Sequence, residues 1–241
     1  MKLIIDSGNT FVKIAVFDNK KLIYSQTTEQ LSTDFLKNLF HLYKINAAII
    51  SSVKKVPLAA INFIKKHTHF IELSASTPIP INNVYKTPET LGKDRLAGVI
   101  GAYYLFPQKT VLVIDAGTCI TYDLINKKGE YYGGSISPGL KMRFNALHTF
   151  TQKLPLVSLK NINTLIGTNT NESILTGVIN GYIAEIDGII EQYKNYTAEL
   201  IVVLCGGDAH FLVNRLKNSI FANPEIVLIG LNEILDYNEA L

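Results

Sequence analysis

An internal repeat constrains this chain more than any other feature of its sequence. Residues 3–10 form an apolar run that ends in an aspartate and is followed by a small residue, a glycine and a nearby threonine, and this order returns at residues 113–118. The two aspartates, Asp6 and Asp115, stand 109 residues apart. A repeat of this kind predicts two halves built on one plan.

Each copy continues in the same way. A second apolar stretch follows, at residues 12–17 and 119–125, then a polar turn and a third strand, which predicts a meander of three strands in each half. Helices and strands then alternate. In the first half we expect a helix at 35–43, a strand at 47–50, a helix after Pro57, a strand at 70–73 and a helix from about 91 that Pro107 ends. In the second half we expect a long helix from about Asn171, a strand at 200–204, a helix after Gly207 and a last strand and helix.

A meander followed by alternating helices and strands predicts an α/β fold, with a mixed sheet flanked by helices in each half. We therefore expect two domains, residues 1–107 and 108–241, with a ligand cleft between them.

Composition excludes several classes of protein. The chain has 241 residues, 47% of them hydrophobic and 18% charged, which is not the composition of a disordered chain. A net charge of +3 does not favour nucleic-acid binding, and no uninterrupted apolar run approaches the roughly 20 residues of a membrane helix. The early charges Lys2 and Asp6 disfavour a secretory signal, and two isolated cysteines suit a reducing compartment. We expect a cytoplasmic protein.

The repeated turns have a direct chemical use. Glycine lets backbone N–H groups approach a phosphate, and a carboxylate at the strand end can hold Mg²⁺ directly or through water. Lys13 interrupts an apolar strand and could donate to phosphate oxygens. The alternative is a pair of ordinary hairpins with Asp and Gly present for turn geometry, and the repetition favours the phosphate site. Neither a P-loop nor a Gly-x-Gly-x-x-Gly motif is present in the sequence.

Other segments leave two interpretations open. Asp94, in Gly92-Lys93-Asp94-Arg95, is either a dipole partner in the first turn of a helix or a proton acceptor beside an arginine that binds a carboxylate. Residues 133–140 combine a tight turn with a helix start, either beside the second Asp turn or as a plain corner. Residues 205–208 are either a strand–turn–helix junction or a place for a nucleotide base or ribose. Gly177 and Gly181 within the long helix suggest close approach to a partner helix or a second subunit.

Taken in order, these motifs resemble those of type III pantothenate kinases, in the superfamily of actin-like ATPases and acetate and sugar kinases. The residues that carry the resemblance are Asp6-Ser7-Gly8-Asn9-Thr10-Phe11-Val12-Lys13, Tyr85 with Gly92-Lys93-Asp94-Arg95, Asp115-Ala116-Gly117-Thr118, residues 134–142, Gly167-Thr168-Asn169-Thr170 and Gly206-Gly207-Asp208-Ala209. Ser7 and Cys119 depart slightly from the family pattern.

The resemblance implies two ribonuclease H-like (actin-like ATPase) halves and ATP-dependent phosphorylation of pantothenate to 4'-phosphopantothenate, the first step of coenzyme A biosynthesis. It implies ATP binding by Asp6, Ser7, Gly8, Asn9, Thr10, Phe11, Val12, Lys13 and Thr118. It implies pantothenate binding by Tyr85, Gly92, Lys93, Asp94, Arg95 and Thr170, with Asp94 as the proton acceptor.

The resemblance also implies Mg-ATP, with Asp6 as a water-mediated Mg²⁺ ligand, and a monovalent cation, K⁺ or NH₄⁺, held by Asp115. It implies a homodimer with no nucleic-acid or membrane partner. The alternatives are another small-molecule kinase or phosphatase of the same superfamily, and a non-catalytic ATP-binding regulator.

Overall fold

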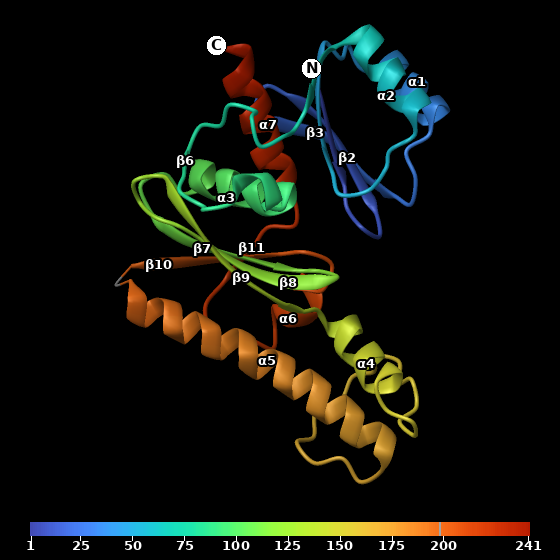
Figure 1. The fold of residues 1–241 in the computed structure, drawn as a ribbon, viewed down its shortest axis with the longest axis vertical. Coiled ribbons are helices and arrows are strands. Elements are labelled where there is room, and N and C mark those ends of the chain that lie inside the picture. The colour runs from blue at the N-terminus through green and yellow to red at the C-terminus, as the bar shows by residue number, and fades with distance from the viewer. Residues whose placement is uncertain (198) are drawn as a thin grey trace. The chain divides into compact units, whose positions relative to one another are not determined.

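The computed structural model describes residues 1–197 and 199–241, which form an α/β chain with two mixed β-sheets (Figure 1). The strands are β1 (Lys2–Ser7), β2 (Val12–Asp18), β3 (Lys21–Thr28), β4 (Ala47–Ser52), β5 (His69–Glu72), β6 (Asn82–Asn83), β7 (Thr110–Ala116), β8 (Cys119–Ile125), β9 (Glu130–Pro138), β10 (Leu200–Cys205) and β11 (Phe221–Ala222). The helices are α1 (Thr33–Leu42), α2 (Leu58–His67), the 3₁₀ turn η1 (Pro88–Thr90), α3 (Lys93–Leu105), α4 (Leu140–Thr149), α5 (Thr170–Tyr196), α6 (Ala209–Leu212) and α7 (Ile226–Glu239). The α/β class and both meanders are confirmed.

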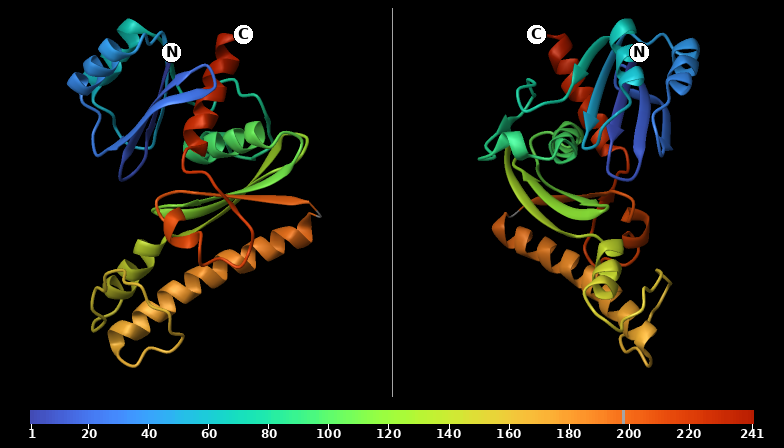
Figure 2. Two further views of the ribbon diagram at one scale, coloured as in Figure 1. Left: turned by 180° about the vertical axis from the view of Figure 1, so that it is seen from behind. Right: turned by 45° about the vertical axis from the view of Figure 1, so that its right-hand side comes forward.

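The first sheet has the strand order β3-β2-β1-β4-β5. β1 is antiparallel to β2 and parallel to β4, so the hairpin is followed by crossover connections. Helices α1 and α2 cover one face of this sheet (Figure 2). Leu36 of α1 and Ile64 of α2 belong to one buried core cluster with Ile5 and Ile14 of the strands. Strand β1 is buried on both faces, which accounts for its continuous apolar run.

The second sheet has the order β11-β10-β7-β8-β9-β6, with β7 parallel to β10. The long helix α5 lies along one face of β7, β8 and β10 (Figure 1). Its buried stripe includes Val178, Tyr182 and Ile186, spaced for one helix face. By length and composition alone, α5 is the one helix among the described residues that could cross a membrane, a test that core helices also pass. Its stripe belongs to the core of this chain.

Two segments differ from their predicted structures. Residues 133–137 were expected in a tight turn, but they extend strand β9 to Pro138. At Gly134 a Cβ would lie 1.6 Å from the carbonyl oxygen of Tyr122, so glycine here lets two adjacent strands approach closely. Helix α5 begins at Thr170, one residue before the expected start, because the side chain of Asn169 accepts a hydrogen bond from the backbone N–H of Glu172.

The chain divides into two compact units. The first contains Met1–Gln108, Ile125–Gly133 and Glu225–Leu241, and the second contains Lys109–Leu124 and Gly134–Pro224. The expected boundary between residues 107 and 108 lies one residue before the division between Gln108 and Lys109. The C-terminal helix α7, which we had assigned to the second half, groups with the first unit because it packs on α3, β1 and β4.

Helix α7 is fixed to the first unit by a close helix crossing. A Cβ on Gly230 of α7 would lie 1.8 Å from the carbonyl oxygen of Ala97 in α3. A Cβ on Gly101 of α3 would lie 2.2 Å from the carbonyl oxygen of Ile226. The two helices are therefore in contact through their backbones, and a larger residue at either position would force them to shift apart.

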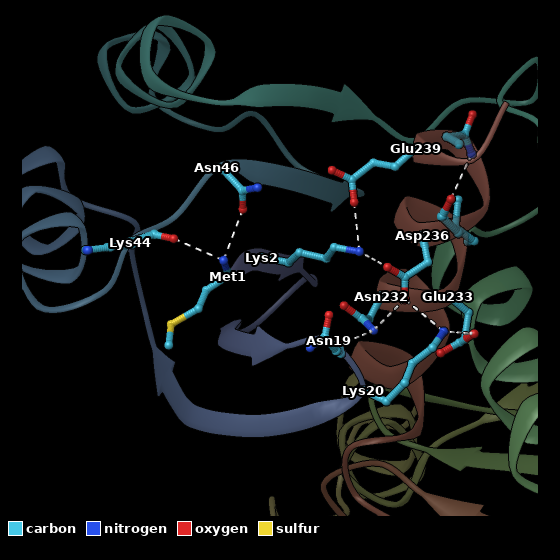
Figure 3. A network of polar contacts seen from close by, with 12 residues as sticks. Met1, Lys2, Asn19, Lys20, Lys44, Asn46, Asn232, Glu233, Asp236 and Glu239 are labelled. Atoms are coloured by element: carbon cyan, nitrogen blue, oxygen red, sulfur yellow. Dashed lines mark hydrogen bonds and ion pairs between the residues drawn. The ribbon is translucent and has the colours of Figure 1, made fainter.

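Charged groups at the surface hold the same helix against the strands (Figure 3). Lys2 of β1 pairs with Asp236 and with Glu239, the latter at 2.7 Å. Lys20, in the turn after β2, lies 2.6 Å from Glu233 and 2.8 Å from Asp236. The amide of Asn232 donates to the carbonyl oxygen of Asn19 at 3.1 Å. Such partly exposed pairs contribute little energy each, so we assign them to orienting α7 rather than to most of its stability.

Replacing Gly230 by alanine should lower the free energy of unfolding by about 1–3 kcal/mol, because the new methyl group overpacks the α3–α7 crossing. Gly101→Ala should act in the same direction, and the double variant should cost less than the two together because both open one contact. Urea unfolding of the three variants measures this. Full additivity would contradict a shared crossing.

Candidate functional site

The first of the repeated motifs forms the turn between β1 and β2, and we call residues 6–11 the first glycine turn. Strand β1 ends at Ser7, and the backbone N–H of Gly8 donates to the carbonyl oxygen of Phe11 at 3.0 Å. A Cβ on Gly8 would lie 3.3 Å from that oxygen, which is tight. Asn9, Thr10 and Phe11 are exposed at the tip. The turn therefore presents backbone groups at the end of a buried strand.

Asp6 lies in a row of polar residues that crosses the sheet. Its register partners are Lys13 on the antiparallel strand β2 and Ser51 on the parallel strand β4. Register partners point to the same face of a sheet, so the carboxylate, the ammonium group and the hydroxyl share one face. The predicted phosphate residues Asp6 and Lys13 are thus neighbours.

Ser51 is a residue of this row that sequence reasoning missed. It is 1% exposed, and its hydroxyl has no hydrogen-bond partner within the described chain. A buried hydroxyl of this kind normally has a partner, so it is a candidate to bind a water molecule or a ligand atom beside Asp6. The signal in the sequence was two serines at the end of an apolar strand, which alone does not reveal the neighbouring carboxylate.

The predicted pantothenate segment lies at the start of α3. Gly92 precedes the helix, and a Cβ on it would lie 2.6 Å from the Oδ1 atom of Asp94. Asp94 is half-buried, and its Oδ1 accepts a hydrogen bond from the backbone N–H of Arg95 at 2.8 Å. The glycine thus leaves room for the carboxylate in the first helical turn, where the helix dipole favours a negative charge.

The structure brings Tyr85 and Arg95 together. The guanidinium carbon of Arg95, a buried residue, lies 5.9 Å from the centre of the Tyr85 ring, within the range of a cation–π contact. The Tyr85 ring also stacks on Tyr131, with ring centres 6.2 Å apart. A Cβ on Gly133 would lie 2.7 Å from the Tyr85 ring, so this glycine makes room for the stack.

The second motif forms the turn between β7 and β8, and we call residues 115–118 the second glycine turn. The N–H of Gly117 donates to the carbonyl oxygen of Cys119 at 2.9 Å. The N–H of Gly139, between β9 and α4, donates to the carbonyl oxygen of Thr118 at 3.2 Å, and that of Asp208 donates to Ala116 at 2.9 Å. Two other loops of the second unit therefore hold this turn through main-chain hydrogen bonds.

Glycine allows both of these loops to approach. A Cβ on Gly139 would lie 2.2 Å from the carbonyl oxygen of Gly117. Gly206 has a φ angle of +90°, and a Cβ there would lie 2.4 Å from both Asp115 Oδ1 and the Ala116 carbonyl oxygen. Residues 205–208 thus form a strand–turn–helix junction that packs on the second glycine turn.

Asp208 and Tyr182 lie beside this turn in partly buried surroundings. Burial raises the pKa of the Asp208 carboxyl, and a hydrogen bond from the backbone N–H of Leu140 opposes that shift. Burial, with the nearby Asp208 carboxylate as a second cause, raises the pKa of the Tyr182 hydroxyl, so the phenol stays protonated. The Leu140–Asp208 hydrogen bond joins the start of α4 to the residue that precedes α6.

Thr170 lies at the start of α5, next to a well-formed cap. The Oε2 atom of Glu172 accepts hydrogen bonds from the backbone N–H of Thr168 at 2.9 Å and from its hydroxyl at 2.6 Å. Thr170 is twelve residues, or roughly 18 Å of helix, from Tyr182 beside the second turn. Within the second unit, the structure therefore does not bring Thr170 to Thr118.

Comparisons with known proteins point to one family. A family model described as type III pantothenate kinase matches residues 2–192. A type III pantothenate kinase of Christiangramia forsetii is 47% identical over 243 residues, covering 99% of each chain. That of Phocaeicola vulgatus is 46% identical over 242 residues, covering 100% of each.

Solved structures share the fold at low sequence identity. A Campylobacter jejuni protein described as a Baf family transcriptional activator has a TM-score of 0.60 at 22% identity, covering 99% of this chain and 100% of that one. A ROK family glucokinase of Streptomyces griseus, in complex with glucose and AMPPNP, has a TM-score of 0.53 at 8% identity, covering 98% of this chain and 99% of that one. The predicted actin-like and sugar-kinase fold class is confirmed.

Gly206→Ala should lower the free energy of unfolding by about 1–3 kcal/mol, because it combines a strained φ with contact against the second glycine turn. Gly207→Ala is the matched control, because a Cβ at Gly207 meets nothing within 4 Å. We expect the control to stay within about 0.5 kcal/mol of the original chain. Equal unfolding midpoints in urea for the two variants would contradict the close approach.

Proposed function

This chain belongs to the type III pantothenate kinase family, and from that membership we propose that it transfers the γ-phosphoryl group of ATP to the primary hydroxyl of pantothenate. The products are ADP and 4'-phosphopantothenate, in the first step of coenzyme A biosynthesis. The observation that carries the proposal is the set of two glycine turns at strand ends with a half-buried Asp94 in the first turn of a helix.

The two glycine turns and the start of β2 would bind ATP. We assign this role to Asp6, Ser7, Gly8, Asn9, Thr10 and Phe11 of the first turn, to Val12 and Lys13 of β2, and to Thr118 of the second turn. The cross-strand pairing of Asp6 with Lys13 supports the assignment, because it sets a cation beside the carboxylate at the end of the sheet. Fixed N–H groups cost no reorganisation when negative charge moves during transfer.

Asp94 would be the proton acceptor. Its Oδ1 atom is oriented by the backbone N–H of Arg95, which leaves Oδ2 as the oxygen to take the proton of the pantothenate hydroxyl. The hydroxyl oxygen then bonds to the γ-phosphorus, and the bond from that phosphorus to the bridging oxygen of ADP breaks. Phosphoryl transfer needs little more from a protein than such a base, positioning and charge stabilisation.

Tyr85, Gly92, Lys93, Asp94, Arg95 and Thr170 would bind pantothenate. The buried Arg95 guanidinium has the fork geometry that suits the carboxylate of this substrate. Its contact with the Tyr85 ring restricts the side chain, which favours one orientation of the bound acid.

We expect each cation to be held by one carboxylate, Mg²⁺ by Asp6 and the monovalent cation by Asp115, rather than by a set of several protein ligands. No group of three or more His, Cys, Asp or Glu side chains gathers as a metal site among residues 1–197 and 199–241. Mg²⁺ bound to ATP keeps several waters and usually takes one or two carboxylates, which suits Asp6 acting through water. Bound Mg²⁺ would neutralise charge on the phosphates, and a monovalent cation, K⁺ or NH₄⁺, would be held by Asp115.

We further propose a cytoplasmic homodimer that uses α5. Gly177, Gly181 and Gly188 are exposed on this helix, and a Cβ on any of them meets nothing within 4 Å in its own chain. Because glycine in a helix costs about 1 kcal/mol relative to alanine, close approach by a second copy would explain what no contact inside the chain does.

Two alternatives remain to be tested against this proposal. Another kinase of the superfamily would prefer a different acceptor in a substrate panel, and a phosphatase would release phosphate with no acceptor. A regulator would bind ATP without turnover. The regulatory description of the Campylobacter jejuni protein concerns that protein, whose 22% identity shows only a shared fold. The decisive assay is pantothenate-dependent ADP release with and without K⁺.

Asp94→Asn should lower kcat by roughly 10²–10⁴-fold, because it removes the proton acceptor while keeping the shape of the side chain. Affinity for MgATP, measured by calorimetric titration, should stay within about twofold of the original chain. Undiminished turnover in this variant would rule out Asp94 as the base.

Gly181→Leu should convert a dimer into a monomer without unfolding the chain, because the new side chain has open space in its own chain. Light scattering after size-exclusion chromatography gives the mass of the particle, and circular dichroism checks the fold. A dimer of unchanged stability in this variant would remove α5 from the interface.

A further inference from the structure

Arg143, which the sequence did not mark, connects three elements of the second unit. It lies in the first turns of α4, and its Nε atom donates to the carbonyl oxygen of Pro138 at 2.8 Å. Its Nη2 atom donates to Ser137 Oγ at 3.1 Å and to Glu185 Oε2 at 2.5 Å. The guanidinium therefore joins the corner between β9 and α4 to helix α5.

That corner packs on the second glycine turn. Pro138 is followed directly by Gly139, whose N–H donates to the Thr118 carbonyl oxygen at 3.2 Å and whose Cα approaches the carbonyl oxygen of Gly117 too closely for a side chain. Any shift of the Pro138 carbonyl thus displaces the group that holds Thr118. The path from Arg143 to Thr118 consists of one side-chain hydrogen bond, one peptide unit and one main-chain hydrogen bond.

The far end of the path is also fixed. Glu185 Oε1 accepts a hydrogen bond from the Tyr122 hydroxyl at 3.1 Å, so both carboxylate oxygens of Glu185 are engaged. Burial and the Glu185 charge raise the pKa of Tyr122, which keeps its hydroxyl a donor. The guanidinium carbon of Arg143 lies 4.9 Å from the centre of the Tyr182 ring, one helical turn from Glu185 on the same face of α5.

We propose that Arg143 is a positioning residue for nucleotide binding, which acts by clamping the β9–α4 corner against Glu185 and so fixes the second glycine turn. The proposal rests on the proposed function, in which this turn and Thr118 bind ATP. Arginine is required because a planar fork can donate to a carbonyl and to a carboxylate at once, which a lysine ammonium on a single stem cannot do in this geometry.

The expected effect falls on ATP alone. Arg143→Gln should raise KM for ATP by about tenfold, the size expected for losing a hydrogen bond to a charged group. Under the same conditions kcat and KM for pantothenate should change by less than about twofold. Glu185→Gln keeps both shape and hydrogen bonding, so it should fold and should raise KM for ATP by a smaller factor. Arg143→Lys should resemble Arg143→Gln.

Arg215→Gln is the matched control. Arg215 also belongs to the second unit, donates to a main-chain carbonyl (Phe211, 2.6 Å) and lies 4.0 Å from the centre of an aromatic ring. Its side chain contacts Phe211 and Asn161, and among the described residues these contacts do not reach the second glycine turn. Its loss should therefore leave KM for ATP unchanged while costing comparable stability. If Arg143→Gln and Arg215→Gln both lower kcat and leave KM for ATP unchanged, the positioning role is overturned.

Hydrogen exchange of the ligand-free chain separates this proposal from the function it rests on. The amide of Gly139 should exchange about fivefold faster in Arg143→Gln than in the original chain or in Arg215→Gln. Unchanged exchange at Gly139 overturns the clamp, and faster exchange with an unchanged KM for ATP overturns its link to the nucleotide. If the original chain releases no ADP with pantothenate, the proposed function fails, and the dissociation constant for MgATP in each variant decides the clamp.

Discussion

At Gly206 the chain turns with a φ of +90° and passes so close to Ala116 that a Cβ would lie 2.4 Å from its carbonyl oxygen. Gly139 approaches the same turn from another loop, and a Cβ on it would lie 2.2 Å from the carbonyl oxygen of Gly117. The shape of the second glycine turn is therefore set by main chain packed on main chain. The turn has a fixed shape before any ligand arrives, which is the form of preorganisation that phosphoryl transfer uses. The small net charge of +3 is compatible with such a site, which needs no basic face.

The local elements were predictable because their signals are local. Apolar runs of strand length, helical spacing of apolar residues and breaks at glycine and proline lie within a few residues of each other, so both meanders and the helices after them could be identified. The strand at residues 133–137 could not be identified in this way, since Gly133-Gly134 also reads as a turn. Only the position of the Tyr122 carbonyl explains Gly134 as a residue of a strand.

Long-range partners explain what the sequence left out of the site. Asp6 and Lys13 stood in one motif, whereas Ser51 reaches the same row only through the parallel pairing of β1 with β4. Arg143 and Glu185 are 42 residues apart on different helices, and neither belongs to a motif. The same holds for α7, whose Gly230 fits against α3 by a backbone contact that no periodicity records. The roles of the motif residues remain proposals. The residues that pack beside them, such as Ser51 and Arg143, could be found only in the structure.

Helix α5 joins two properties that would otherwise be separate. Tyr182 and Glu185 hold the corner beside the second glycine turn. The exposed Gly181 lies one helical turn before Glu185, and the exposed Gly177 lies one turn before Gly181. If a second copy binds at these glycines, any shift of α5 is passed to Glu185 and hence to Arg143. Linkage then requires reciprocity: an association that favours the clamped corner tightens ATP binding by the same factor by which ATP strengthens association. If dimerisation does not shift α5, the monomer and the dimer should bind ATP equally well. A partner that binds the clamped and the unclamped corner with equal affinity does not change the equilibrium between them.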